Sequence, residues 1–135
     1  MSNIIIREYA PSDKDPLNFL AMSATDDGDA LLVRSSLRLL DFDGVLAFVA
    51  ECDGELVGFN VGIGLPSGVL LPEGMYVDPD YRRQGTAKRL SEALEKASGC
   101  SVSMAYYKPE LAPYYARLGY DSGDNLVVGI KELKA

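Results

Sequence analysis

Residues 82–89 gather four positive charges around a glycine, in the order Arg82-Arg83-Gln84-Gly85-Thr86-Ala87-Lys88-Arg89. The pattern predicts a turn that opens a helix. The first N–H groups of a helix have no internal partner and carry roughly half a positive charge through the helix dipole. Backbone amides from Arg83 to Ala87 could therefore hold a pyrophosphate, with Gly85 allowing close approach and Ala87 keeping the next turn narrow. The cations stand out in a chain whose formal net charge is −7, which supports an anionic ligand.

Other phosphate-binding motifs do not account for this segment. The pattern GxxxxGK[ST] of nucleotide P-loops is absent, and so is the GxGxxG of dinucleotide-binding folds. A glycine at a helix start can also be a simple turn, and that alternative stays open on these residues alone.

The chain contains no histidine, which limits the chemistry available to it. Histidine triads, His-ligated zinc sites and HExxH proteases are excluded. Any general base must be a carboxylate, a tyrosine, a lysine or a relayed water. Cys52 and Cys100 show neither CxxC spacing nor a disulfide framework, so no metal site is expected.

One mixed α/β domain over residues 1–135 is predicted to position these groups. Hydrophobic periodicity, turn residues and helix caps predict the order β-α-α-β-β-β-α-β-α-β. Asp53-Gly54 between apolar runs predicts a β-hairpin. The expected elements are strands at 4–9, 45–50, 56–61, 69–77, 101–106 and 125–133, and helices at 12–22, 30–40, 85–98 and 109–118, the last regular from about Ala112. Pro72 and Gly74 predict an edge position or a bulge in the strand 69–77.

Two motifs resemble the GNAT superfamily of acyl-CoA-dependent N-acetyltransferases. The family signature is Arg or Gln, two residues, Gly, one residue, and Gly or Ala, and residues 82–87 satisfy it. Tyr114-Tyr115-Ala116-Arg117-Leu118-Gly119-Tyr120 is similar to the family's tyrosine-containing helix. The order of elements matches across essentially the whole chain. The resemblance implies a central, mostly antiparallel sheet of about six strands, with splayed fourth and fifth strands, flanked by about four helices.

The resemblance also implies a co-substrate and roles for particular residues. Acetyl-CoA would bind with its pantetheine arm between the splayed strands, and its acetyl group would pass directly to an amine without a covalent enzyme intermediate. Glu73 would be the base or hold the substrate amine, and Tyr115 would donate a proton or a hydrogen bond to the departing sulfur. The alternatives are a solvated carboxylate for Glu73 and a packed aromatic for Tyr115. The implied cofactor-binding residues are Tyr76, Val77, Arg82, Arg83, Gln84, Gly85, Thr86, Ala87 and Lys88.

The acceptor is expected to be a small-molecule or peptide amine. Asp26, Asp27 and Asp29 lie in the loop between the first two helices and could attract a cation, although an ordinary solvated acidic loop would look the same. Two alternatives to this enzyme are a non-catalytic acetyl-CoA sensor and a protein-directed acetyltransferase. The acidic charge argues against nucleic-acid binding. Without an apolar run long enough to span a membrane or a secretion signal, a cytoplasmic protein is expected. GNAT proteins often form dimers, so a homodimer stays open.

Overall fold

The computed structural model describes residues 3–24, 30–122, 129 and 131–133. The chain divides into two compact units, residues 1–105 and 106–135. The first unit contains β1 (Ile4–Glu8), η1 (Pro11–Asp13), α1 (Lys14–Ala21), α2 (Ala30–Ser36), η3 (Leu37–Asp41), β2 (Val45–Cys52), β3 (Glu55–Gly64), β4 (Val69–Val77), η4 (Pro79–Tyr81), α3 (Thr86–Ser98) and β5 (Val102–Ser103). The second contains η5 (Pro109–Leu111) and α4 (Ala112–Arg117).

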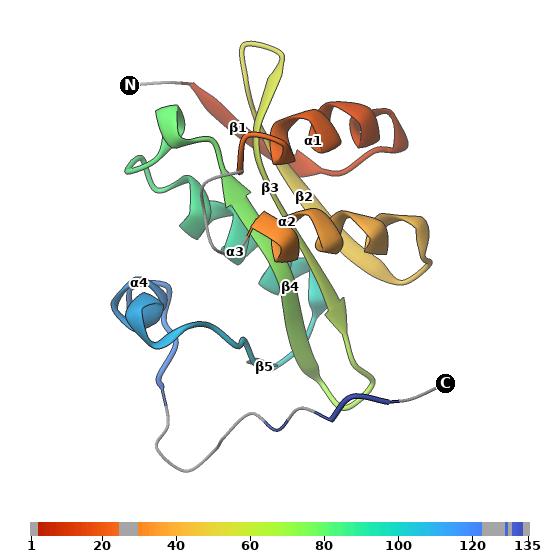
Figure 1. Ribbon diagram of the computed structural model, residues 1–135, viewed down its shortest axis with the longest axis vertical. Coiled ribbons are helices and arrows are strands. Elements are labelled where there is room, and N and C mark those ends of the chain that lie inside the picture. Colours follow the sequence, from red (N-terminus) through yellow and green to blue (C-terminus); the bar gives the residue numbers. More distant parts are fainter. Residues whose placement is uncertain (1–2, 25–29, 123–128, 130, 134–135) are drawn as a thin grey trace. The chain divides into compact units, whose positions relative to one another are not determined.

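The first unit is built on a five-stranded sheet whose strands lie in chain order, β1-β2-β3-β4-β5 (Figure 1). The first four strands are antiparallel to their neighbours, and β5 runs parallel to β4. This mixed sheet with flanking helices confirms the predicted fold class, and five of the expected strands lie among the described residues. The expected final strand at 125–133 falls largely outside the described residues, and its described members, 129 and 131–133, lie in no strand.

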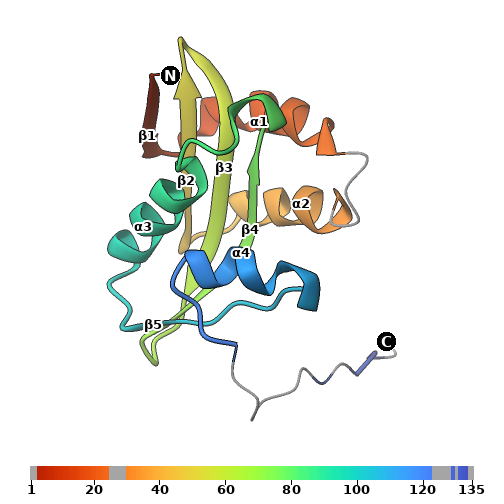
Figure 2. The same ribbon diagram turned by 90° about the vertical axis from the view of Figure 1, so that its left-hand side faces the viewer.

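Helices cover both faces of this sheet (Figure 2). The face toward α1 and α2 carries the larger hydrophobic core, which includes the fully buried Phe59, Val49 and Leu17. On the other face, α3 buries Leu90 against Val77. The sheet is thus a middle layer, and β4 contributes side chains to both cores.

The β2–β3 hairpin follows from its turn residues. Asp53 and Gly54 have φ values of 52° and 84°, the left-handed pair that a two-residue type I′ turn requires. The prediction of a hairpin at Asp53-Gly54 is confirmed. Because the turn fixes the register, the apolar run of β2 is placed opposite that of β3.

Helix α3 approaches β3 closely because β3 presents glycine on that side. A Cβ atom at Gly62 would lie 2.9 Å from Cδ2 of Leu94, and one at Gly58 would lie 3.5 Å from Cδ1 of Leu90. Asn60, between them, donates from Nδ2 to the carbonyl oxygen of Leu90 at 2.8 Å. These contacts hold the helix that begins at the predicted pyrophosphate site.

β4 and β5 pair over a very short distance. The ladder contains Val69↔Val102 and Leu70↔Ser103, after which the pairing ends. The remainder of β4, from Leu71 to Val77, extends beyond this ladder. The predicted splay between these strands is confirmed, but the strand expected at 101–106 is reduced to two residues.

The second unit contains a short helical segment. Pro109 opens η5, and Pro113 lies in the first turn of α4, where its missing N–H does no harm. The regular helix starts at Ala112, as the sequence predicts.

Candidate functional site

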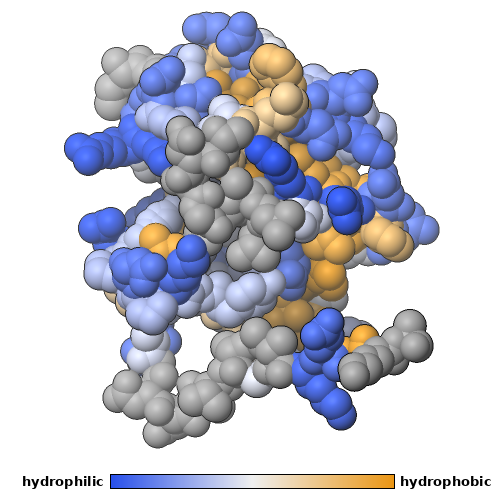
Figure 3. Space-filling model, viewed as in Figure 1, coloured by the Kyte–Doolittle hydropathy of each residue, from blue (hydrophilic) through white to orange (hydrophobic). Residues whose placement is uncertain are grey.

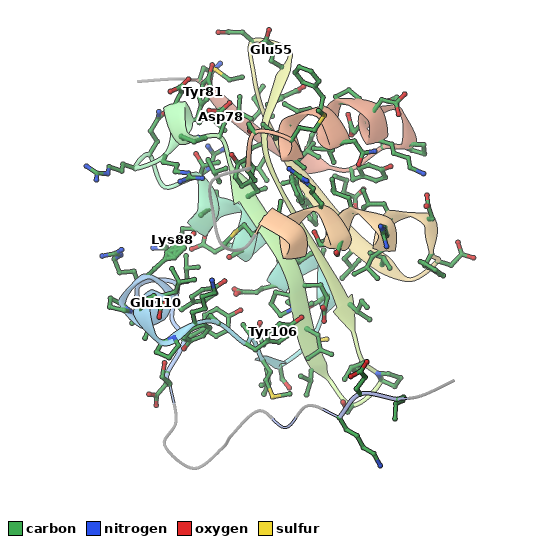
Figure 4. All side chains as sticks on the ribbon, in the orientation of Figure 1. Glu55, Asp78, Tyr81, Lys88, Tyr106 and Glu110 are labelled. Carbon is green, nitrogen blue, oxygen red and sulfur yellow. The ribbon has the colours of Figure 1, made fainter. Side chains whose placement is uncertain are left out.

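The turn that leads from β4 into α3 is held by its own backbone and side chains. Asp78 ends the strand, its N–H donating to the carbonyl oxygen of Val57 at 2.8 Å. Its carboxylate accepts from the N–H of Asp80 at 2.9 Å and caps η4. In Figure 4, Asp78 and Tyr81 lie together in this turn, and Lys88 lies further on, on α3. These hydrogen bonds define the path of the chain into α3.

Arg82 connects this turn to the end of β4. Its Nε donates to the carbonyl oxygen of Val77 at 2.8 Å, and its guanidinium carbon lies 5.5 Å from the centre of the Tyr76 ring. Both contacts join residues that the sequence assigns to cofactor binding, Arg82 with Val77 and Arg82 with Tyr76. Arg82 thus orients the strand end as well as supplying charge, a role that the motif alone does not indicate.

Gly85 is the N-cap of α3 and has a left-handed backbone, with φ 79°. A Cβ atom built there would meet nothing within 4 Å, so the space beside this residue at the start of the helix is open. Arg83 is also left-handed, with φ 64°, which is unfavourable for a residue with a side chain. Strained backbone of this kind is concentrated at ligand sites.

The first turn of α3 presents donors to this open space. The helix makes its first backbone hydrogen bond from the N–H of Arg89 to the carbonyl oxygen of Gly85, at 3.1 Å. The N–H groups of Thr86, Ala87 and Lys88 therefore precede the internal hydrogen bonds. Thr86 is 2% exposed, and its Oγ1 has no hydrogen-bond partner. A buried polar atom without a partner is unfavourable, and a bound anion would supply the missing acceptor.

The four cations of the segment are not equivalent. Arg89 donates from NH1 to the carbonyl oxygen of Ile4 at 2.9 Å, so it anchors α3 to β1. Lys88 lies 4.0 Å from Glu92 one turn along, in an exposed pair of little energetic weight. Figure 3 shows hydrophilic side chains projecting to solvent from this side of the first unit. Arg89 thus serves the fold, whereas Arg82, Arg83 and Lys88 carry the positive charge that the sequence assigns to the cofactor.

Glu73 is the extra residue of a β-bulge in β4. The β3–β4 register passes from Val61↔Gly74 to Gly62↔Pro72, which leaves Glu73 between two pairs. The bulge predicted from Pro72 and Gly74 is confirmed. Bulges re-aim side chains and are common beside active sites. The glutamate is half-buried, at the part of β4 that lies beyond the β5 ladder.

Tyr76 points its side chain to the opposite side of the sheet from α3. It is 5% exposed, and its hydroxyl lies 3.0 Å from Oγ of Ser23, at the end of α1. The side chain therefore belongs to the core, and only the main chain of Tyr76 is left to serve a ligand. Asp26, Asp27 and Asp29 lie outside the described residues.

Tyr115 lies in the second unit, in the middle of an aromatic cluster. Its ring stacks on Tyr107 with centroids 4.1 Å apart and meets Tyr114 and Tyr120 edge-on at 5.3 and 5.7 Å. The ring is half-buried. These contacts fix its orientation within the unit, which serves a packed aromatic and a positioned donor equally well.

Within the described residues, no helix is long and apolar enough to cross a membrane. The same part of the chain holds no group of three or more His, Cys, Asp or Glu side chains placed to bind a metal ion.

Comparison with known proteins gives a family match and structural neighbours. The model of the acetyltransferase (GNAT) domain matches residues 43–122. No curated protein sequence matches the chain. Among solved structures, the aminoglycoside N-acetyltransferase AAC(6')-Iy in complex with CoA superposes with a TM-score of 0.75 at 22% identity, covering 98% of this chain and 97% of that one.

Two further neighbours carry other acceptor names. The ribosomal-protein-alanine N-acetyltransferase from Brucella melitensis biovar Abortus 2308 has a TM-score of 0.71 at 23% identity, over 96% of this chain and 99% of that one. The glucosamine-6-phosphate N-acetyltransferase from Arabidopsis thaliana has a TM-score of 0.69 at 18% identity, over 96% and 99%. These likenesses establish the fold and leave the acceptor open.

Proposed function

The chain belongs to the GNAT acetyltransferase family, and from that membership we propose that it moves an acetyl group from acetyl-CoA to a primary amine of a small molecule or peptide. As a member of this family it is an acyltransferase. The transfer is direct, with no covalent enzyme intermediate. The remaining question is what each residue of this chain contributes.

The start of α3 is the observation that carries the proposal. It combines open space at Gly85, three helix-start N–H groups and the buried, unpartnered hydroxyl of Thr86. This donor set suits the pyrophosphate of acetyl-CoA, which accepts hydrogen bonds and carries negative charge. Arg82, Arg83 and Lys88 add positive charge nearby, while the main chain of residues 83–87 provides the cradle.

The free length of β4 is the second support. The β5 ladder ends at Leu70, so the strand beyond it can accept an extended, amide-containing arm at its edge. The main chain of Tyr76 and Val77 is assigned to that arm. The carbonyl oxygen of Val77 already accepts from Arg82 and retains a second lone pair. Arg82 therefore fixes the orientation of a group that the arm would also contact.

Glu73 is assigned the role of the base that accepts the proton of the acceptor amine. An alkyl ammonium with a pKa near 10.4 must lose its proton to attack, which costs about 4 to 5 kcal/mol at pH 7. The Glu73 carboxylate on the bulge accepts that proton directly or through one water, which frees the nitrogen lone pair. The thioester supplies an activated acetyl group when acetyl-CoA is bound.

Tyr115 is assigned to the leaving sulfur. Its phenol donates a proton or a hydrogen bond as the C–S bond breaks, which prevents an uncompensated thiolate from forming. A phenol near pKa 10 facing a thiol near 8.5 transfers its proton uphill in water. An apolar site raises the pKa of the thiol and removes that disadvantage. The stacking of Tyr115 on Tyr107 keeps the donor in one orientation.

The negative charge of the protein assigns the acceptor to the class of cationic amines. The chain has 20 acidic and 13 basic residues, and Asp26, Asp27 and Asp29 precede α2. A polyamine, an aminosugar or a basic peptide terminus fits that field. Structural neighbours named for an aminoglycoside and for a ribosomal-protein alanine both use amine acceptors, which is compatible with this class.

The test is acetyl-CoA-dependent release of free CoA thiol across polyamines, aminoglycosides, amino acids and short peptides. Thiol from Cys52 and Cys100 is subtracted with a blank that contains enzyme and acetyl-CoA but no amine. Release with one class of amine, confirmed by the mass of the acetylated product, supports the proposal. A folded protein that binds acetyl-CoA stoichiometrically and acetylates none of these amines would instead indicate a sensor or a protein-directed enzyme.

A further inference from the structure

Glycine is required at position 74 because a neighbouring side chain leaves no room for a Cβ atom, and not because of its backbone conformation. Unlike Gly44 and Gly54, it does not have a positive φ, so other residues could adopt its conformation. A Cβ atom built on Gly74, however, would lie 2.2 Å from Oγ and 2.4 Å from Cβ of Ser36 in α2. Both distances are far below any real contact. α2 lies against β4 at this point only because residue 74 has no side chain (Figure 1).

Ser36 cannot turn away to relieve such a clash. It is 4% exposed, and its hydroxyl donates to the carbonyl oxygen of Val33 at 2.7 Å, where α2 passes into η3. A change of rotamer would break that hydrogen bond and would leave the Cβ of Ser36 in place. A side chain at residue 74 therefore has to move the helix or the strand.

The contact adjoins the proposed active carboxylate. Gly74 is the residue after Glu73, the extra residue of the β4 bulge. α2 packs against β4, the strand that carries Glu73. A side chain at residue 74 therefore changes the position of α2 relative to Glu73.

We propose that the Gly74–Ser36 contact positions α2 against β4, and thereby sets how the acceptor amine is presented to Glu73. This inference rests on the proposed function. Gly74 and Ser36 are positioning residues, because neither one is assigned a contact with the substrate. They act on the acceptor step and leave the start of α3, where acetyl-CoA is held, untouched.

The decisive experiment removes the Cβ atom of residue 36 in α2 and adds one to residue 74 in β4, first separately and then together. Gly74→Ala alone overfills the contact and Ser36→Gly alone empties it, so each should raise the KM for the acceptor on the order of tenfold, as misplacement of a substrate by a fraction of an ångström does. The double variant Gly74→Ala/Ser36→Gly restores one carbon at the contact and should recover most of the loss. The Kd for acetyl-CoA, from calorimetry, should change less than about twofold in all three.

Two controls separate position from stability. Ser36→Ala keeps the Cβ atom and loses the hydroxyl, so it should leave the acceptor KM near the wild-type value and should fail to rescue Gly74→Ala. Gly64→Ala adds the same methyl group to β3, where the nearest atom is Sγ of Cys100 at 3.4 Å, an ordinary contact. Circular dichroism and thermal unfolding establish that each variant is folded.

The acceptors in this experiment are spermidine, neamine and a short alanyl peptide, whichever the wild type acetylates. A wild type that acetylates none of the three, nor any other member of the amine panel described above, contradicts the proposed function and this inference with it. An active wild type whose acceptor KM is unchanged in folded Gly74→Ala or Ser36→Gly contradicts this inference alone. If Gly74→Ala does not fold, Ser36→Gly and the double variant decide. Equal losses of acceptor and acetyl-CoA binding would also overturn it, because they indicate general damage.

Discussion

Gly85→Ala offers the sharpest test of the acetyl-CoA site, because its effects on stability and on binding should separate. Gly85 has φ 79°, and a Cβ atom there meets nothing within 4 Å. In the free protein the only penalty is therefore that of a left-handed backbone, about 1 kcal/mol. For a chain of 135 residues this lowers Tm by about 4 °C.

Binding should suffer much more. We expect the new methyl group to enter the open space at the start of α3, where the pyrophosphate is assigned. Loss of one hydrogen bond to a charged group costs about 1.5 to 3 kcal/mol, so the Kd for acetyl-CoA should rise about 10- to 100-fold.

The matched control is Gly99→Ala, at the other end of the same helix. Gly99 is the C-cap of α3, with φ 65°, and a Cβ atom there also meets nothing within 4 Å. It should lose as much stability as Gly85→Ala while binding acetyl-CoA like the wild type. Calorimetric titration and thermal unfolding of both variants are the measurements. Equal affinities in the two variants would refute the assignment of the site to the start of α3.

Four further substitutions test the Thr86 hydroxyl, the Arg7–Asp13 ion pair and the two proposed catalytic residues. Thr86→Val replaces a buried, unpartnered hydroxyl with an isosteric methyl group, so it should raise the free energy of unfolding by about 1 kcal/mol and weaken acetyl-CoA binding about tenfold. A lower free energy of unfolding with unchanged acetyl-CoA affinity would count against a contact between the hydroxyl and the phosphate. Asp13 accepts from Arg7 at 2.8 and 2.9 Å, which lowers the pKa of its carboxyl, so its stabilisation is present above the unfolded pKa of about 3.9 and is lost as pH falls through the lower folded value. In urea titrations Asp13→Asn should therefore be about 1.5 to 3 kcal/mol less stable at pH 7, and the gap should narrow below pH 4; a constant gap would contradict this. Tyr115→Phe and Glu73→Gln should each lower kcat about 100-fold or more at pH 7 with acetyl-CoA affinity unchanged, and the Glu73→Gln loss should shrink as pH approaches the pKa of the amine; wild-type kcat values would remove either residue from the mechanism.

Much of the fold is predictable from local sequence because each signal has one structural solution. Asp53-Gly54 dictates a type I′ turn, and β4 occupies 69–77 as its apolar residues predict. The predicted helix at 30–40 is α2 followed by η3, a 3-10 segment that begins at Leu37. Hydrophobic periodicity does not distinguish an α-helix from a 3-10 segment that continues it.

The short β5 shows where pattern reasoning is insufficient. Val102, Met104 and Tyr106 alternate as in a strand, yet they are 55%, 52% and 54% exposed. Alternation indicates that one face could be buried, but it does not say what covers that face. Only Val102–Ser103 pairs with β4.

The candidate site divides in the same way. The Gly85 turn and the bulge at Glu73 follow from glycine and proline spacing, which constrain the backbone directly. The hydrogen-bond partners of long side chains do not follow from such spacing. Arg89 belongs by sequence to the cationic segment, yet it donates a hydrogen bond to the carbonyl oxygen of Ile4, near the other end of the sequence. The contact of Gly74 with Ser36 likewise joins residues that no motif connects.

The order of the strands in the sheet has a consequence for how the protein folds and opens. Strands β1 to β4 neighbour one another in chain order, and the β2-β3-β4 meander closes only short loops. Low sequence separation favours rapid formation of such contacts. The β4–β5 ladder needs the whole α3 crossover and then gains two residue pairs. The amide of Met104, which donates to Leu70, should therefore exchange with solvent well before the amides of β2 and β3, so the edge assigned to the ligand is also the one that loosens first.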